Sequence, residues 1–262
     1  MSMSDYWENR SEKEYVYRGE KFYTITPISL YHHRRSFIVS RLLKYIGKQQ
    51  EKGDIILDYG CGDGWYLAYL ARHGKYRLYG CDISPGFVQR ALLACPADVR
   101  LADMPEGRIP FADRFDFVYS IAVLAHILSD EDLRRTVADI ADHTMEGGHV
   151  FCFESTSSHR RQGPTWVRRT SQDYVRLFEE AGFRPVASEH LVYPLFTLYQ
   201  LTAMRLIGRV FFRGSAEERQ LAMNASSVMQ KLGDVVVGLD RLMSFFPIRL
   251  TGNTLFVFQK AR

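Results

Sequence analysis

The sequence predicts an α/β fold in which a doubly wound, mostly parallel sheet is covered by helices on both faces. The middle of the chain alternates strand-like and helix-like segments at the pace of βαβ units. A glycine-rich turn stands between an apolar strand and a helix start at residues 58–64. The chain has 262 residues, of which 46% are hydrophobic, so it suits one large domain, or one domain with an insertion, around a packed core.

The glycine turn follows an apolar strand at residues 55–57. Asp58 ends that strand, and Gly60, Gly62 and Gly64 come at alternate positions, with Cys61 after the first. Glycines there tolerate positive φ and let a ligand approach the main chain, and the next helix offers free N–H groups at its start. A dinucleotide fingerprint reads G-x-G-x-x-G. Because the third glycine here comes one residue early, the turn predicts a ligand site but disfavours a nicotinamide cofactor.

Two further acids end the next two strands. Residues 77–82 read as a strand ending in Asp82, which Ile83 follows, and residues 99–102 read as a strand that runs into Asp103 and Met104. Asp82 lies in the range, roughly 20 residues past the glycines, where α/β nucleotide folds place a carboxylate on the ribose hydroxyls. Each acid alone could be a turn former. Three acids in this order favour a binding site.

These motifs resemble those of the class I S-adenosylmethionine (SAM)-dependent methyltransferases. The resemblance implies a Rossmann-like sheet of seven strands whose last strand, residues 254–259, runs antiparallel beside the sixth, residues 184–192. It also implies that the glycine turn packs on the methionyl part of SAM, that Asp103 holds the adenine amino group and that Met104 packs on the ring. Residues 114–126 look like the fourth strand and the segment that flanks the methyl group. The predicted cofactor-binding residues are Asp58, Gly60, Cys61, Gly62, Gly64, Asp82, Ile83, Asp103, Met104, Ser120 and Arg34.

Catalysis by such an enzyme needs in-line alignment in a dry pocket, and a base helps when the acceptor is a hydroxyl. His126 is the best candidate base, because it lies just past the fourth strand and histidine titrates near neutrality. A purely structural histidine is an equal alternative. His32, His33 and Glu154 are reserve candidates.

Four segments are predicted: an N-terminal lid and helix (1–48), the SAM-binding core (49–193), a helical insertion (194–248) and the last core strand (249–262). The N-terminal segment is rich in tyrosine and arginine and leads into a helix at residues 37–46. In the family such a segment often covers SAM, and an arginine in it pairs with the SAM carboxylate. Arg34 or Arg35 is the candidate here, and solvation of a helix surface is the equal alternative.

The insertion contains an apolar stripe at three- and four-residue steps, which needs a partner. Its members are Val228, Leu232, Val235, Val236, Leu239, Leu242 and Phe246. The stretch 195–213 is nearly long enough to span a membrane, but Arg205 and Arg209 make a span costly. With Arg213 they form a basic stripe typical of helices on anionic membrane surfaces. Packing on the core, a hydrophobic acceptor or a homodimer would also use these apolar residues, so the partner stays open.

The loop after the fifth strand, residues 155–170, is basic. It contains His159, Arg160, Arg161, Arg168 and Arg169, with Trp166 between the pairs and no acid. Ligands of open α/β sheets lie beyond the carboxyl ends of the strands. Arginine forks suit phosphate or carboxylate, and an indole face suits a sugar or an aromatic ring. A solvated surface loop is the plain alternative, but the cluster as a whole favours an anionic acceptor.

The composition narrows the class of protein. A formal charge of +4 is too small to demand a nucleic-acid partner. The four cysteines are scattered and read as reduced and mostly buried, no metal site is indicated, and the N-terminus lacks a signal peptide, so a cytoplasmic protein, or one peripheral to a membrane, is expected.

The function predicted is therefore SAM-dependent methyl transfer to a small, glycan or lipid-linked acceptor, through oxygen. The sequence lacks the Asn/Asp-Pro-Pro-Tyr/Phe signature of adenine and glutamine methyltransferases and the Pro-Cys nucleophile of cytosine C5 enzymes. An N-methyltransferase of a small molecule, or a degenerate methyltransferase fold acting as a scaffold at a membrane surface, are the alternatives. The acceptor, the methylated atom and the oligomeric state stay open.

Overall fold

The computed structural model describes residues 2–12, 15–17, 20–22, 28–47, 54–102, 108–191, 226–243 and 252–262, together with 195, 210, 214 and 223. The chain divides into two compact units. The first comprises Met1–Glu12, Leu42–His190 and Thr251–Arg262, and the second comprises Lys13–Arg41 and Leu191–Leu250.

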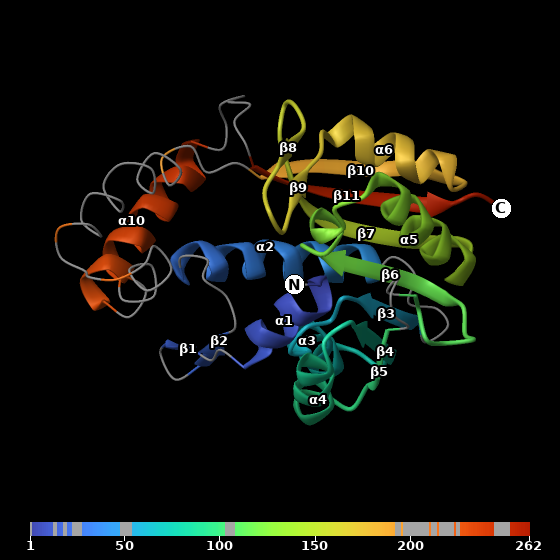
Figure 1. Cartoon of the computed structure of the whole chain (residues 1–262), viewed down its shortest axis with the longest axis horizontal. Coiled ribbons are helices and arrows are strands. Elements are labelled where there is room, and N and C mark those ends of the chain that lie inside the picture. Colours follow the sequence, from blue (N-terminus) through green and yellow to red (C-terminus); the bar gives the residue numbers. More distant parts are fainter. Residues whose placement is uncertain are drawn as a thin grey trace. The chain divides into compact units, whose positions relative to one another are not determined.

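The elements of the N-terminal half are α1 (Met3–Ser11), β1 (Tyr15–Tyr17), β2 (Glu20–Phe22), α2 (Ile28–Ile46), β3 (Ile55–Tyr59), α3 (Trp65–His73), β4 (Arg77–Asp82), α4 (Pro85–Ala94), β5 (Asp98–Leu101) and β6 (Phe115–Ile121). Those that follow are the 3-10 helix η1 (Leu124–His126), α5 (Asp130–His143), β7 (Thr144–Thr156), β8 (Arg161–Gln162), β9 (Val167–Arg168), α6 (Ser171–Glu180), β10 (Phe183–Leu191), α10 (Ser227–Met243) and β11 (Gly252–Lys260). Figure 1 shows them along the chain.

The first unit is built on one seven-stranded sheet with the order β10-β11-β7-β6-β3-β4-β5. The pairs β3–β4, β4–β5, β3–β6 and β6–β7 are parallel, and β11 runs antiparallel to β7. The predicted fold class is confirmed, including the antiparallel last strand beside the sixth. Because the chain passes from β3 to β4 on one side and reaches β6 on the other, the carboxyl ends of β3 and β6 form the switch point where such sheets bind ligands.

Helix starts follow the capping signals in the sequence. Ser129 accepts a hydrogen bond from the Asp132 N–H at 3.3 Å, and Thr170 forms a capping box with Asp173. The end of α5 differs from what the sequence indicates. The pair Gly147-Gly148 predicts the end of a helix that begins after Ser129, but α5 ends at His143, and β7 begins at Thr144. An irregular register opposite residues 115–117 and a φ of 75° at Gly147 let the strand continue through the glycines.

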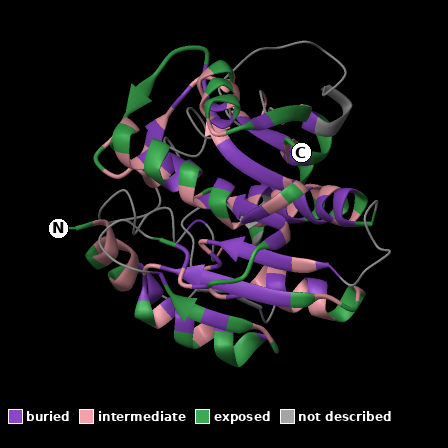
Figure 2. Cartoon of the chain, turned by 90° about the vertical axis from the view of Figure 1, so that its right-hand side faces the viewer, coloured by how far each residue is buried: buried purple, intermediate pink, exposed green. Residues whose placement is uncertain are grey.

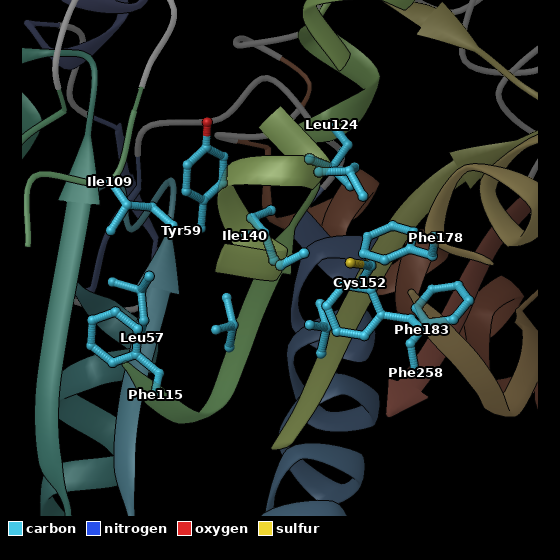
Figure 3. Close-up of a cluster of buried hydrophobic side chains, with 14 of the residues drawn as sticks. Leu57, Tyr59, Ile109, Phe115, Leu124, Ile140, Cys152, Phe178, Phe183 and Phe258 are labelled. Carbon is cyan, nitrogen blue, oxygen red and sulfur yellow. The ribbon is translucent and has the colours of Figure 1, made fainter. Parts of the chain in front are cut away.

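The core on one face of the sheet lies under α5 and α6. Side chains of this cluster include Leu57, Tyr59, Ile140, Cys152 and Phe178, and Figure 3 shows them together. The rings of Phe178 and Phe258 stack at 4.2 Å between centroids. The opposite face is covered by α3 and the last residues of α2, where Tyr45 meets Phe151 at 6.4 Å. The inner strands β11, β7, β6, β3 and β4 are therefore mostly buried, as Figure 2 shows, while the edge strands β10 and β5 and the outer sides of the helices are largely exposed.

In the second unit, α10 has two different faces. Leu30 and Val237 are buried together, with Leu191 and Val236 packed against them. Val228, Leu232, Val235 and Leu239 of the predicted apolar stripe are exposed. The side chain of Leu242, residue Phe246 and the three arginines at 205, 209 and 213 lie outside the described residues, so a membrane or dimer role for this region stays a prediction. Among the described residues, no helix is long and apolar enough to cross a membrane.

Candidate functional site

The glycine turn after β3 has the backbone that the sequence predicts. Gly60, Gly62 and Gly64 all have positive φ, at 79°, 53° and 74°. The N–H groups of Gly60 and Cys61 both donate to the Cys81 carbonyl, at 2.8 and 3.0 Å. The turn is therefore fixed to β4 through its own main chain.

Two of these glycines face different surroundings. A Cβ on Gly60 would lie 2.3 Å from Cγ2 of Val123, so only glycine lets the turn pack on the segment after β6. A Cβ on Gly62 would meet nothing within 4 Å. The main chain at Gly62 thus borders open space, where a ligand can approach it closely.

Asp82 links the end of β4 to the glycine turn. Its Oδ2 accepts from the Gly62 N–H at 2.9 Å, and its Oδ1 accepts from the Ser84 N–H at 3.0 Å. Burial raises the pKa of this carboxyl, and the N–H donors act in the opposite direction. Because each carboxylate oxygen has two lone pairs, both oxygens keep the capacity to accept a further hydroxyl.

Buried polar atoms lie on the neighbouring strands β3 and β6. Asp58 is paired in register with Tyr119, and Ser120 follows on β6; both Asp58 and Ser120 are buried. Within the described part of the chain, Oδ2 of Asp58 and Oγ of Ser120 have no hydrogen-bond partner. Burial raises the pKa of Asp58 well above its ordinary value. Such atoms are rare in native structures and call for an explanation, such as a ligand or a water.

The short helix α1 packs against this edge of the first unit. Oγ of Ser4 donates to the Ile83 carbonyl at 3.3 Å, and Oε2 of Glu8 accepts from Oγ of Ser84 at 2.6 Å and from the Gly86 N–H at 3.0 Å. Trp7 of the same helix contacts the His126 ring edge-on, with 4.8 Å between the ring centroids. Residues that follow β4 and β6 are thus joined by one helix.

Sequence reasoning did not find α1, although one signal was readable. Ser2 and Asp5 form a capping box, in which the Asp5 N–H donates to the Ser2 hydroxyl and the Ser2 N–H donates to the Asp5 carboxylate, each at 3.0 Å. The contacts of Glu8 with Ser84 and Gly86 join residues 76 and 78 positions apart, which no local pattern reveals.

Glu154, a reserve candidate base, has a different role. Its side chain is fully buried at the end of β7 and accepts three backbone N–H groups, from Val123 at 3.1 Å, Leu124 at 2.9 Å and Ala125 at 3.0 Å. Burial raises its pKa to about 7. The carboxylate therefore caps η1, the turn that ends in His126, and is not available to an acceptor.

His126 is half-buried at the end of η1. Its Nδ1 lies 2.6 Å from the Thr165 carbonyl, which can only accept, so Nδ1 carries the proton and the lone pair of the neutral ring is on Nε2. Burial lowers the pKa of His126, and the charge of Arg10 adds to the effect. The imidazole is therefore neutral at neutral pH.

The basic loop forms the hairpin β8–β9, and one acid compensates two of its cations. Arg169 is buried and donates to Oδ1 of Asp130 at 2.8 and 3.0 Å and to the Ile127 carbonyl at 3.0 Å. Arg160 is paired with the other oxygen of Asp130. These arginines hold the hairpin against the segment between η1 and α5.

The remaining predicted residues lie elsewhere. Asp103 and Met104 are outside the described residues. Arg34 is half-buried on α2 in the second unit, near the buried Arg35, whose guanidinium lies 4.3 Å from the centroid of the Tyr31 ring. The four cysteines are free and buried, as predicted.

A family model described as a methyltransferase domain matches residues 31–203, which is more than half of the chain. The chain therefore belongs to the class I SAM-dependent methyltransferases. The cofactor of this family is SAM, so the predicted family and cofactor are confirmed.

Individual relatives are more distant. A phosphoethanolamine N-methyltransferase of Arabidopsis thaliana is 26% identical over 151 residues, which are 52% of this chain and 30% of the relative. A ribosomal protein L11 methyltransferase of Geobacter sulfurreducens is 37% identical over 100 residues, 37% of this chain and 31% of the relative. The matches thus span about a third of each relative's length.

Among solved structures, a putative sarcosine dimethylglycine methyltransferase of Galdieria sulphuraria has a TM-score of 0.59 at 15% identity. The match covers 99% of this chain and 98% of that one. At this identity, the likeness concerns the fold alone.

Proposed function

We propose that this chain transfers the methyl group of SAM to a hydroxyl oxygen of a small acceptor, with His126 as the general base. The observation that carries the proposal is the fixed neutral imidazole. Its Nδ1–H is held by the Thr165 carbonyl at 2.6 Å, and Nε2 keeps its lone pair. When bound, SAM supplies an electrophilic methyl group, so the protein has only to align the acceptor and receive its proton.

The residues around the switch point fit the cofactor. The open main chain at Gly62 would lie against the methionyl part, and Asp82 would accept the two ribose hydroxyls with the lone pairs its N–H donors leave. The buried oxygens of Asp58 and Ser120 would gain partners through the cofactor or its waters. Contacts of Asp103 and Met104 with adenine, and of Arg34 with the SAM carboxylate, stay predictions.

Calorimetric titration with S-adenosylhomocysteine tests the cofactor half of this proposal. We expect Asp82→Ala to weaken binding by about 100-fold, since charge-assisted bonds worth roughly 1.5–3 kcal/mol each disappear. The matched control is Asp98→Ala, which removes an exposed acid paired with Arg100 at 2.7 Å. Equal binding by the two variants would contradict the assignment of Asp82.

A second candidate, N-methylation of a small amine, is favoured by the similarity to a phosphoethanolamine N-methyltransferase. A neutral His126 could take a proton from an ammonium group as well as from a hydroxyl. Transfer of labelled methyl from SAM to matched pairs of compounds, each pair differing only by hydroxyl against amine, separates the two candidates. Labelled ether products support O-methylation, and labelled amines alone would replace it with the second candidate.

A further inference from the structure

The hairpin β8–β9 places two arginines directly opposite each other. Arg161 pairs with Arg168 in the antiparallel register, and Gln162 pairs with Val167. Directly opposed residues have Cβ atoms about 4.5–5.5 Å apart, and like charges at such positions are destabilising. Burial and the charge of Arg161 both lower the pKa of Arg168. The fold therefore places the exposed Arg161 directly opposite the half-buried Arg168.

The other two arginines of this loop are each paired with an acid. Arg160 and Arg169 both pair with Asp130. Across the ranges that the structure describes, neither Arg161 nor Arg168 forms an ion pair with a carboxylate. Nε of Arg161 donates to Nε2 of His159 at 3.0 Å, and the Arg168 guanidinium lies 4.9 Å from the centroid of the Trp166 ring.

The hairpin is fixed beside the candidate base. Thr165 lies in the turn between β8 and β9, and its carbonyl accepts the hydrogen bond from Nδ1 of His126. The turn is tight: the Gly163 N–H donates to the Trp166 carbonyl at 2.8 Å, and a Cβ on Gly163 would lie 2.5 Å from the Trp166 ring. Arg161 and Arg168 thus lie in the strands of the same hairpin whose turn supplies the group that positions His126.

We propose that Arg161 and Arg168 form the binding site for the phosphate group of a phosphorylated acceptor. This inference rests on the proposed function and names its substrate class. A carboxylate has two oxygens and one charge, which a single guanidinium fork satisfies. A phosphate monoester carries close to two charges and three strong acceptor oxygens, so it compensates both cations and can accept from both forks. Trp166 adds an apolar wall beside the pair.

An NMR titration provides the test. The whole chain is labelled with ¹⁵N-arginine and saturated with S-adenosylhomocysteine, and the arginine side-chain Nε resonances are followed. The probes are phenyl phosphate, benzoate and benzyl alcohol, which share a ring and differ in charge. We expect phenyl phosphate to shift two arginine resonances saturably, at least about tenfold more tightly than benzoate, with no effect of benzyl alcohol. No saturable shift with phenyl phosphate, or equal binding of benzoate, would overturn the proposal.

Variants assign the site to these residues. Arg161→Gln and Arg168→Gln should each weaken phenyl phosphate binding about tenfold or more. Arg160→Gln is the matched control, because it removes a neighbouring cation that already has an acid, and it should bind the probe as the wild type does. If all three variants bind alike, the assignment is wrong.

The readout is binding and needs no turnover, so it is independent of the proposed chemistry. His126→Asn should keep phenyl phosphate binding, because the Asn amide can still donate to the Thr165 carbonyl. Phosphate binding without methyl transfer to any hydroxyl would leave the arginine site standing and count against O-methylation. Methyl transfer to a hydroxyl without phosphate binding at Arg161 and Arg168 would support O-methylation and overturn the arginine site.

Discussion

The two halves of the carboxyl edge of the sheet are built in different ways. In the half that we propose binds the cofactor (the cofactor half), β3, the glycine turn and the end of β4 lie within residues 55–84, and their contacts, such as Gly62 with Asp82, span 20 positions. In the half that we propose binds the acceptor (the acceptor half), Glu154, His126 and Arg169 have partners 29 to 42 positions away. One half is a contiguous motif with prescribed backbone angles, and the other exists only when distant strands and loops come together.

The two halves also differ in charge. Asp58 and Asp82 are buried carboxyls in the cofactor half, where burial raises their pKa values. The acceptor half carries the arginines of the hairpin, of which Asp130 compensates two. A positively charged sulfonium suits the first environment, and an anionic acceptor suits the second. Four variants test how far the halves are separate.

The largest effect should come from His126→Asn, which acts on the acceptor half alone. The Asn amide keeps a donor towards the Thr165 carbonyl but removes the basic Nε2. We expect kcat to fall by about 100-fold to 10,000-fold, the usual contribution of general base catalysis, with unchanged affinity for S-adenosylhomocysteine. His73→Asn, at the exposed end of α3, is the control. An undiminished kcat would make His126 a structural residue.

Gly60→Ala should damage both halves at once, since Gly60 touches Val123 of the acceptor half. The alanine would be strained at a φ of 79°, and its Cβ would overlap Cγ2 of Val123. We expect a loss of about 2–4 kcal/mol in the free energy of unfolding, measured in urea. Val123→Ala in the same chain should recover the overlap part only, because the backbone strain remains. Simple additivity of the two changes would show that the halves are not coupled here.

Glu154→Gln tests the cap on η1 through the dependence of activity on pH. In the wild type, protonation with a pKa of about 7 turns one oxygen from an acceptor into a donor facing the Ala125 N–H, so kcat should fall below about pH 7. Glutamine keeps one acceptor oxygen and has no such titration. We expect it to lower kcat about tenfold at pH 8 and to remove this acid limb. An unchanged profile would mean that Glu154 does not position His126.

The stability of the wild type should depend on pH in the opposite sense to kcat: it should rise as the pH is lowered. Because burial raises the pKa of Glu154 from 4.5 to about 7, its contribution to stability is present below about pH 4.5 and is lost as the pH rises through 7. The loss is roughly 3 kcal/mol. Urea unfolding at pH 5 and pH 8 should show a smaller loss in Glu154→Gln, whereas Glu146→Gln, an exposed acid on the same strand, should behave as the wild type.

Glu8→Gln should have the smallest effect, because it loosens α1 at the margin of the cofactor half and leaves the glycine turn and Asp82 unchanged. The variant loses the charge in the bonds from Ser84 and Gly86, which should weaken binding of S-adenosylhomocysteine a few-fold by calorimetry. Glu12→Gln, just beyond α1 and exposed, is the matched control. Identical affinities would show that α1 does not help to close the cofactor half.

The sequence by itself determined the fold class, the family and the cofactor turn. Strand and helix periods, capping residues and glycines that need positive φ act within a few positions of the chain, so Gly60, Gly62, Gly64 and their neighbours can be read directly. The seven-stranded sheet with its antiparallel last strand also followed, through the resemblance of those motifs to a known family. The helix α1 was missed, and the ends of some elements, such as that of α5 at His143, were misjudged.

The tertiary structure alone decided what the charged residues of the acceptor half do. Five basic residues in one loop cannot be told apart by their role from the sequence. In the structure, Asp130 compensates Arg160 and Arg169, while the register of the short strands β8 and β9 places Arg161 opposite Arg168. Glu154 changed from a reserve base to the cap of η1 for the same reason. Burial and partners fix the role of a charged group, and both come from residues that are distant in the sequence and close in the fold.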